Sequence, residues 1–374
     1  MRHIYIHVPF CGRRCVYCDF AIAVRPDTPS DRFVDSIATE LRLRRDHPGW
    51  DDSPIETVYL GGGTPSRLDP AAVAILLDRI RIDAGLSPKV NVEITLEANP
   101  EDVSKASAEA WVAAGVNRVS LGAQSFHPRV LEWMHRMHTA DQTVQAVDIL
   151  RNAGITTLSL DLIFGLPQAL GHDVARDVER AVALAPDHLS AYGLTIEART
   201  PLFRRRNRGE TVAAPDEQYQ SDFLAANRDL VEAGFEHYEV SNYALPGKRA
   251  VHNSAYWSGR PYLGLGPSAH SFDGGRRRWN EREWTQYLAL VEAGRDPVGG
   301  SETLTEEQRV LEAIMLGLRT STGVELKLID ADRVEELSTT GWLAVEGERL
   351  RLTTAGWLRM EAILARLTTS AKGG

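Results

Sequence analysis

The chain has 374 residues, of which 43% are hydrophobic and 25% charged, as in a folded protein with room for about two or three domains. Its net charge of −9 argues against a protein that binds nucleic acid without sequence preference, because such a protein needs a basic surface. The sequence contains no apolar run near the ~18 residues that would span a bilayer and no secretory signal, so we expect a cytoplasmic protein.

Residues 1–200 alternate short apolar runs with amphipathic stretches, a pattern typical of repeated βα units. The expected strands are His3–Val8, Thr57–Leu60, Val92–Glu97, Arg118–Gly122, Thr157–Phe164 and Leu189–Thr195. Helices are expected between them, at 31–45, 70–82, 104–113 and 141–152. Such units form a parallel sheet with right-handed crossovers. Six units are too few for an ordinary eight-stranded barrel, so we predict an α/β fold with a partial (β/α)6 barrel. A doubly wound sheet is the alternative on this pattern alone.

In the second half of the chain the amino-acid composition and sequence pattern change twice. His, Tyr, Trp and Gly are dense in 238–272, and the basic run Arg276 to Arg278 follows, which we interpret as a solvated loop, with anion contacts as the alternative. We therefore expect a barrel over 1–235, a linker or ligand-contact segment over 236–300 and a third domain over 301–374.

The third domain is predicted to be an α+β unit with a winged-helix-like module. Its expected elements are a helix at Glu306–Leu318, a hairpin formed by Trp342–Val345 and Arg349–Leu352, and a helix at Ala355–Leu367. Residues 301–374 carry 12 acidic and 9 basic side chains, which favours a structural or protein-contact role over DNA binding.

All three cysteines lie in the sequence Cys11-x-x-x-Cys15-x-x-Cys18, directly after the first expected strand. An odd number of cysteines so close together cannot form a disulfide framework, and a metal site in a reducing compartment fits better. The spacing lets one loop wrap around a 4Fe–4S cluster with each thiolate on a different iron. The fourth iron then stays open for a substrate or cofactor. The alternatives are three incidental thiols or a zinc site, for which His7 is the close candidate for a fourth ligand.

This cysteine motif, with the aromatic Tyr17 before its last cysteine, resembles the signature of the radical S-adenosylmethionine (SAM) superfamily. The resemblance implies that Cys11, Cys15 and Cys18 hold a 4Fe–4S cluster at the mouth of a partial barrel. It also implies that the amino and carboxylate groups of SAM chelate the open iron. In that superfamily an electron from the cluster cleaves SAM to a 5′-deoxyadenosyl radical.

Glycines and polar residues interrupt the apolar runs where the expected strands end, which is where β/α barrels carry their active sites. Gly61-Gly62-Gly63-Thr64-Pro65 follows the second strand, and glycine lets backbone approach a ligand closely. Glu97 ends the third strand, Gln124 follows the fourth, and Asp161 lies in the fifth. A carboxylate in an apolar run needs a partner, for which Arg136 is a candidate. Taken alone, each of these residues is explained equally well by a structural role. Their positions at the ends of successive strands favour a single ligand site.

The chain is also similar over essentially its whole length to the coproporphyrinogen dehydrogenase subgroup. The similar segments are residues 7–11, 61–65, 122–126 and 161–167. This resemblance implies that SAM is contacted by Tyr5, Tyr17, Gly62, Gly63, Thr64, Glu97, Gln124, Arg136 and Asp161.

Two features depart from the dehydrogenase pattern. Residue 20 is Phe, where that pattern has a fourth cysteine, and Cys11 is not preceded by the N-terminal extension that covers the active site in dehydrogenases. Oxidative decarboxylation of a porphyrinogen needs a positioned substrate shielded from solvent. We therefore expect that this chain does not perform that reaction.

Both departures are typical of the HemW-type heme chaperones, whose motif His-Asn-x-x-Tyr-Trp is similar to residues 252–257. The resemblance implies heme as bound cargo. A neutral imidazole is a good axial ligand of heme iron, and aromatic side chains stack on the macrocycle. His252, Tyr256 and Trp257 are thus the candidate heme contacts, with His270 as the rival iron ligand. The alternative is that His252 packs locally while Tyr256 and Trp257 fill the core.

Two classes of function remain. In the first, the chain carries heme to an acceptor protein of unknown identity, and the SAM cluster regulates, assembles or triggers the transfer. In the second, the chain is an oxygen-independent coproporphyrinogen III dehydrogenase-like oxidoreductase whose radical abstracts hydrogen from a porphyrin. We favour the carrier and assign no residue a catalytic role. Membrane association through the acceptor stays open, although no segment of this sequence requires it.

Overall fold

The computed structural model describes residues 2–45, 54–85 and 92–368, and it is built around a nine-stranded sheet. The strand order is β11-β1-β4-β5-β6-β7-β8-β10-β9, and β1 and β4 to β8 pair in parallel. These six strands are β1 His3–Val8, β4 Thr57–Gly62, β5 Glu93–Ala98, β6 Arg118–Gln124, β7 Thr157–Phe164 and β8 His188–Gly193. They follow one another in chain order without the reversal that defines a doubly wound sheet. The predicted partial (β/α)6 barrel is confirmed.

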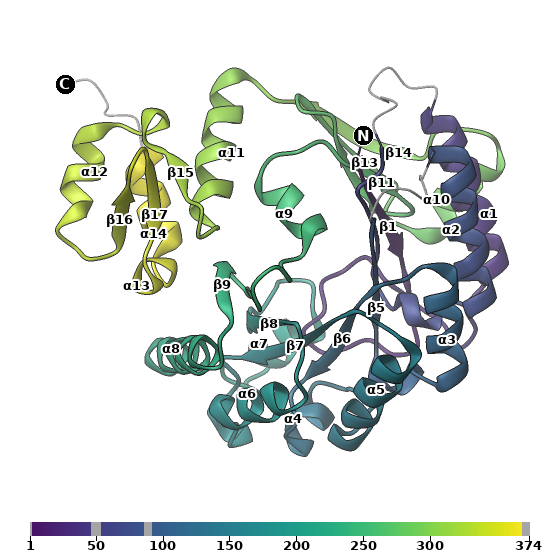
Figure 1. Cartoon of the computed structure of the whole chain (residues 1–374), viewed down its shortest axis with the longest axis horizontal. Coiled ribbons are helices and arrows are strands. Elements are labelled where there is room, and N and C mark those ends of the chain that lie inside the picture. The colour runs from purple at the N-terminus through teal and green to yellow at the C-terminus, as the bar shows by residue number, and fades with distance from the viewer. Residues whose placement is uncertain (1, 46–53, 86–91, 369–374) are drawn as a thin grey trace.

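Helices cover the outer face of this curved sheet in chain order (Figure 1). They are α1 Ser30–Arg45, α2 Pro70–Ala84, α3 Lys105–Ala114, α4 Pro128–Trp133, α5 Ala140–Ala153, α6 Val174–Ala183 and α8 Asp216–Glu232. Helix α7, Pro201–Asn207, lies apart from this face and is bonded to Val16 in the cysteine segment. The four helices predicted here from sequence, α1, α2, α3 and α5, begin and end within two residues of their expected bounds. Their apolar faces pack on strands such as β1, in which most residues are buried, and together they form the main core.

Local sequence explains where two of these helices begin and end. Helix α3 starts with a capping box between Ser104 and Ser107, and α5 starts with one between Thr139 and Gln142. Each helix ends at a glycine with a positive φ, a conformation that glycine adopts without steric cost. These caps fix the residues at which each helix begins and ends, and therefore where the chain turns back toward the next strand.

The segment 236–300, expected as a linker, instead extends both edges of the sheet. Strands β9 (Glu236–Glu239) and β10 (Asn242–Ala244) add to the β8 edge in antiparallel pairs. Strand β11 (Leu263–Leu265) pairs in parallel with β1 at the other edge, and helix α9 (Val251–Trp257) connects the two edges. Strands of three or four residues are too short to show a periodic pattern, which explains why the sequence did not indicate them.

A second, three-stranded antiparallel sheet follows, with α10 (Trp284–Glu292) between its last two strands. Its strands are β12 His270–Phe272, β13 Arg276–Asn280 and β14 Val298–Thr303. The run Arg276 to Arg278 therefore lies on a strand, and the prediction of a solvated loop is wrong. Its arginines are held by acidic partners, for example Arg278 by Asp296 at 2.5 Å.

The C-terminal domain forms a separate lobe with its own core (Figure 1). It contains α11 Glu306–Leu318, β15 Val324–Glu325, α12 Ala331–Ser338, β16 Leu343–Glu346, β17 Arg349–Leu352, α13 Thr354–Trp357 and α14 Met360–Thr368. The predicted hairpin is confirmed, whereas the last predicted helix is divided into α13 and α14. Likeness to a winged helix stays a prediction. Within the described ranges, no helix combines the length and apolar character needed to cross a membrane.

Candidate functional site

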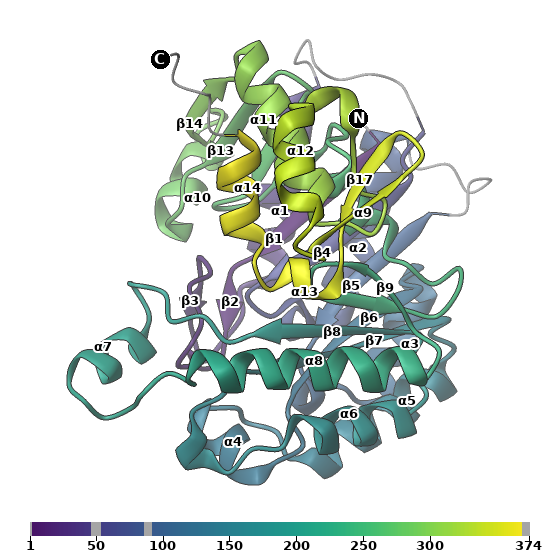
Figure 2. The ribbon, with the colours of Figure 1, turned by 90° about the vertical axis from the view of Figure 1, so that its left-hand side faces the viewer.

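The three cysteines lie on a short loop that is closed at its base by two strands, β2 (Phe10–Cys11) and β3 (Ala23–Val24). The amide of Ala23 donates to the carbonyl of Pro9 at 2.7 Å, and the amide of Arg25 donates to that of Cys11 at 3.0 Å. Figure 2 shows β2 and β3 near helix α7, which is tied to this loop by the amide of Leu202 on the carbonyl of Val16 at 2.8 Å. The loop is thereby held at the carboxyl ends of the barrel strands.

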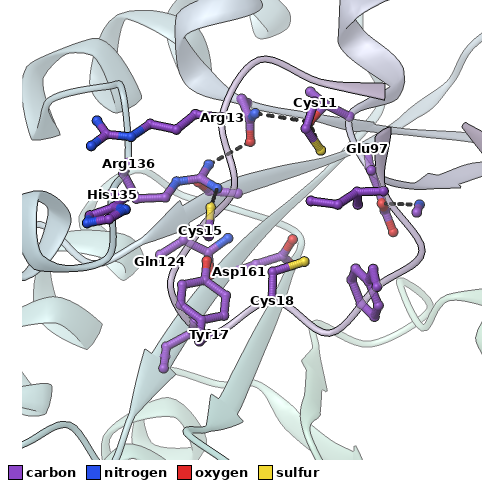
Figure 3. Close-up of a pocket in the computed structure, with 18 of the residues that line it drawn as sticks. Cys11, Arg13, Cys15, Tyr17, Cys18, Glu97, Gln124, His135, Arg136 and Asp161 are labelled. Atoms are coloured by element: carbon purple, nitrogen blue, oxygen red, sulfur yellow. Dashed lines mark hydrogen bonds between the residues drawn. The ribbon is translucent and has the colours of Figure 1, made fainter. Parts of the chain in front are cut away.

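Cys11, Cys15 and Cys18 line one cavity of about 440 Å³ at the barrel mouth (Figure 3). Burial raises the pKa of the Cys11 thiol to about 11, so its thiolate form needs a compensating positive charge. The hydroxyl of Thr64 donates to the sulfur of Cys11 at 3.3 Å, and Arg136 donates to that of Cys15 at 3.6 Å. This set of sulfur donors in a cavity fits a bound iron–sulfur cluster, which would supply the missing positive charge.

The zinc alternative fits less well, because His7 has both ring nitrogens engaged. Its Nε2 lies 2.8 Å from the carbonyl oxygen of Ala21, and its Nδ1 lies 3.0 Å from the hydroxyl of Tyr5. Across the described part of the chain, no three His, Cys, Asp or Glu side chains converge on the position of one metal ion. A 4Fe–4S cube does not require such convergence, since each thiolate binds a different iron.

The glycine-rich turn after β4 brings backbone close to the end of β1. A Cβ atom at Gly63 would lie 2.8 Å from the carbonyl group of Pro9, and Gly62 has a φ of 109°. The amide of Gly62 donates to the Oε2 atom of Glu97 at 2.9 Å. Only glycine fits these positions without displacing β1, so the turn can present its backbone to the cavity.

Glu97 is a buried carboxylate on the cavity wall. Burial raises its pKa to about 7, assisted by the charge of Asp161 and opposed by hydrogen bonds from Tyr59 and from the amide of Gly62. The two donors occupy one lone pair on each oxygen and leave other lone pairs free. An ammonium group bound there would favour the ionised form of Glu97, which suits the amino group of SAM.

Gln124 at the end of β6, Asp161 in β7 and Arg136 in the segment between α4 and α5 complete the cavity. The hydroxyl of Ser120 donates to Asp161 at 3.0 Å, and burial raises the pKa of this carboxyl group. Gln124 has a φ of 65°, where the pairing of β6 with β7 shifts register. Arg136 donates to the Oδ1 atom of Asn99 at 2.6 Å.

The structure thus brings most of the expected SAM contacts together around the cysteines. The predicted residues on the cavity wall are Tyr17, Gly62, Gly63, Thr64, Glu97, Gln124, Arg136 and Asp161. Tyr5 does not line this cavity; its hydroxyl bonds to His7, and it borders a neighbouring cavity. The sequence interpretation missed Asn99, Ser120 and Tyr192, which also line the cavity. The rule that polar residues at strand ends form the site could have found Asn99, which directly follows β5.

Of the four candidate heme contacts, Tyr256 and His270 border the same cavity, whereas His252 and Trp257 do not. His252 is 1% exposed, with its Nδ1 atom 2.7 Å from the hydroxyl of Thr57 and its Nε2 atom 2.8 Å from that of Tyr256. Its ring is therefore not accessible to a heme iron in this conformation, in agreement with the local packing weighed as the alternative. Trp257 and His270 border two different cavities, and His270 is exposed.

Comparisons with known proteins agree with this geometry. The sequence profile of the Radical SAM superfamily matches residues 5–181, and that of the HemN C-terminal domain matches residues 304–359. The structure of coproporphyrinogen III oxidase (HemN) from Escherichia coli, described as a radical SAM enzyme, superposes with a TM-score of 0.82. The match covers 98% of this chain and 90% of that one, and at 21% identity it shows a shared fold.

Curated relatives named heme chaperone HemW are more similar in sequence. The protein from Mycobacterium tuberculosis is 39% identical over 93% of this chain and 90% of its own length. That from Bacillus subtilis is 33% identical over 87% and 86%, and that from Escherichia coli is 37% identical over 71% and 69%. Membership of the radical SAM superfamily implies a 4Fe–4S cluster and SAM as cofactors. With its three-cysteine loop, partial barrel and C-terminal domain, the chain belongs to the HemW heme chaperone family of the radical SAM superfamily.

Proposed function

We propose that this protein binds heme and transfers it to an acceptor protein, using a barrel mouth built for a 4Fe–4S cluster and SAM. The observation that carries the proposal is the extent of similarity to heme chaperones, which reaches 93% of the chain at 39% identity. It therefore includes the C-terminal lobe and the segment 236–300 as well as the barrel. A cytoplasmic location and an acceptor protein stay predictions.

Within this proposal, the residues of the barrel mouth have distinct tasks. Cys11, Cys15 and Cys18 hold the cluster, and the glycine turn and Glu97 orient the amino acid end of SAM. A bound cluster supplies an electron for cleavage of SAM in this superfamily. Thr64 and Arg136 stabilise negative charge on the sulfur atoms, since each donates to a cysteine.

For the heme itself, we propose contact with the region around α9 and β12. His252 would have to leave two buried hydrogen bonds to reach an iron, whereas His270 is already at the surface. Moving His252 is unfavourable, because breaking the hydrogen bonds of a buried histidine raises the free energy of the folded protein. We therefore propose Tyr256 as a contact residue and His270 as the iron ligand, since both border one cavity whereas Trp257 borders another.

Two measurements on anaerobically purified, reconstituted protein test the proposal. Titration with hemin should produce a saturable Soret band with one heme per chain. Incubation of the reduced protein with SAM and coproporphyrinogen III should yield no protoporphyrinogen above a control without protein. Turnover of coproporphyrinogen would favour the oxidoreductase, and failure to bind hemin would contradict the carrier.

A further inference from the structure

A second cavity, of about 450 Å³, lies between the cysteine loop, helix α9 and the sheet formed by β12 and β13. Its volume is in the range of small-molecule and cofactor sites, ~300–1,000 Å³. Leu316 of α11 borders it as well, so the cavity lies where the barrel meets the C-terminal lobe. Helix α9 separates the barrel strands from α11 at this place (Figure 1).

Aromatic side chains form one wall of this cavity. The rings of Tyr256 and Tyr262 meet edge to face with centroids 4.6 Å apart, and Phe272 follows with its ring centroid 6.5 Å from that of Tyr262. All three border the cavity. A wall of this kind matches a flat apolar ring system, because aromatic side chains bury large areas and stack on other rings.

His270 borders the same cavity from the first position of β12. Neither of its ring nitrogens has a hydrogen-bond partner within the described part of the chain, in contrast to His252 and His7. Burial and the nearby Arg277 lower the pKa of His270, which favours the neutral imidazole. A neutral imidazole with a free nitrogen is the form that binds a heme iron.

The charges around this cavity favour an anionic ligand. Three arginines border it, of which Arg277 is paired with Glu302 and Glu312 and Arg260 with Glu56, so Arg282 supplies the positive charge for a ligand. Arg282 is exposed, and one of its guanidinium N–H groups donates to the carbonyl oxygen of Asp19 at 3.3 Å. Other donors of its guanidinium can therefore reach a ligand carboxylate in a bidentate fork, the geometry that arginine provides and lysine does not.

The cavity also adjoins the candidate cluster site. Asp19 and Phe20 border both cavities, so the end of the cysteine loop forms a shared wall. Phe20 is 64% exposed although it is a large apolar side chain, and exposed apolar surface of this kind often marks a binding site. A flat apolar ligand in the second cavity would cover part of that surface.

We propose that this second cavity is where heme binds, with His270 as the iron ligand, the aromatic wall against the macrocycle and Arg282 at a propionate. The inference rests on the proposed function and adds to it the cavity, the aromatic wall and the propionate contact. Heme combines the features that the cavity selects for: a flat apolar ring, a metal that binds imidazole, and a carboxylate.

The first test replaces the ligand. Hemin titration of the full chain, followed by the Soret band and by EPR of the ferric heme, compares the original protein with His270→Ala. We expect a change of the ferric spin-state signal, a shifted Soret band and affinity reduced by about tenfold or more. Added imidazole should restore the original spectrum in His270→Ala, which a merely structural defect would not allow.

The second test changes the charge. Arg282→Glu should weaken hemin binding at least severalfold and reduce its dependence on salt, because an attractive pair is replaced by a repulsive one. Arg295→Glu is the matched control, since Arg295 is exposed and does not border the cavity. Circular dichroism and reconstituted iron content verify that the variants fold.

The outcomes separate the inference from the proposed function. If the original protein binds hemin while His270→Ala and Arg282→Glu keep its spectrum and affinity, heme binds elsewhere and the inference is wrong. If the original protein does not bind hemin, the proposed function itself fails. A response of the Arg295→Glu control equal to that of Arg282→Glu would also overturn the assignment, because it would show a general charge effect.

Discussion

The Nδ1 atom of His252 lies 2.7 Å from the hydroxyl oxygen of Thr57, the first residue of β4. The same hydroxyl lies 3.0 Å from Nδ1 of His3, and the other nitrogen of His252 lies 2.8 Å from the hydroxyl of Tyr256. This buried chain of polar groups fastens α9 to the amino ends of β1 and β4. The cysteine loop lies beyond their carboxyl ends, so His252 and the cluster site are at opposite ends of these strands.

We therefore expect His252→Ala to act mainly on stability. Loss of two buried hydrogen bonds should lower the free energy of unfolding by about 1–3 kcal/mol, measured by urea denaturation. The spectrum of bound hemin should stay unchanged. Asn253→Ala, on the same helix, is the control and should have a smaller effect. Loss of the Soret band at unchanged stability would instead identify His252 as the ligand.

Replacing Cys11, Cys15 or Cys18 by Ala should each abolish a stable 4Fe–4S cluster, because the cube then keeps only two protein ligands. Iron and sulfide content after anaerobic reconstitution measures this directly. Met137→Ala serves as the control, since Met137 borders the same cavity and is 56% exposed. Preserved iron and sulfide in any cysteine variant would contradict its assignment as a ligand.

The raised pKa of Glu97 predicts a pH-dependent affinity for SAM. Its ionised form binds an ammonium group, and its pKa is about 7 when no cation is bound. Affinity should therefore fall as the pH drops below about 7, approaching tenfold per pH unit. Calorimetric titration should show this slope in the original protein, whereas Glu97→Gln should bind more weakly and with little slope. A slope that persists in Glu97→Gln would assign it to another group.

The same group affects the stability of the protein without SAM, with the opposite sign. Its pKa is 4.5 in the unfolded chain and about 7 in the folded one, so between these values the folded state binds more protons. The contribution of Glu97 to stability therefore decreases as the pH rises through this window. Urea denaturation at several pH values should show a smaller decrease for Glu97→Gln than for the original protein.

Gly63→Ala should disturb the turn that carries the SAM contacts. Its Cβ atom would lie 2.8 Å from the backbone of Pro9, which cannot rotate away as a side chain could. We expect a loss of about 1–3 kcal/mol in unfolding free energy together with weaker SAM binding. Gly275→Ala is the matched control, because the nearest atom to its Cβ would be 3.9 Å away and no strain follows. Equal effects of the two substitutions would contradict this explanation.

Glu40 ties the segment before His270 to helix α1. This carboxylate is fully buried and accepts hydrogen bonds from the amide of Gly266 at 2.8 Å and the hydroxyl of Tyr287 at 2.7 Å. Glu40→Ala leaves those donors unpaired in the core and should cost about 3–5 kcal/mol, measured by denaturation. The exposed Glu283→Ala should cost little. A cost for Glu40→Ala as small as for Glu283→Ala would show that water replaces the carboxylate.

Much of the barrel and its site could be predicted from the chain because the signals are local. Apolar periodicity located the six parallel strands, and the spacing of Cys11, Cys15 and Cys18 indicated a shared cluster. Strand order then brings residues such as Glu97 and Asp161 to one end of the sheet, because parallel strands all end on the same side. The local sequence pattern and the common direction of the parallel strands are together sufficient to predict the barrel and much of its site.

Other features depend on contacts between distant segments. The sequence indicated that Tyr5 contacts SAM, but its side chain lies at the neighbouring cavity. It placed His252 beside heme, but a hydrogen bond to Thr57, 195 positions away, holds the ring in the core. It gave no sign that β11 pairs with β1, which brings His270 next to the cysteine loop. Whether a histidine faces a cavity or a buried partner is decided by three-dimensional packing, since a free nitrogen and a bonded one look identical in sequence.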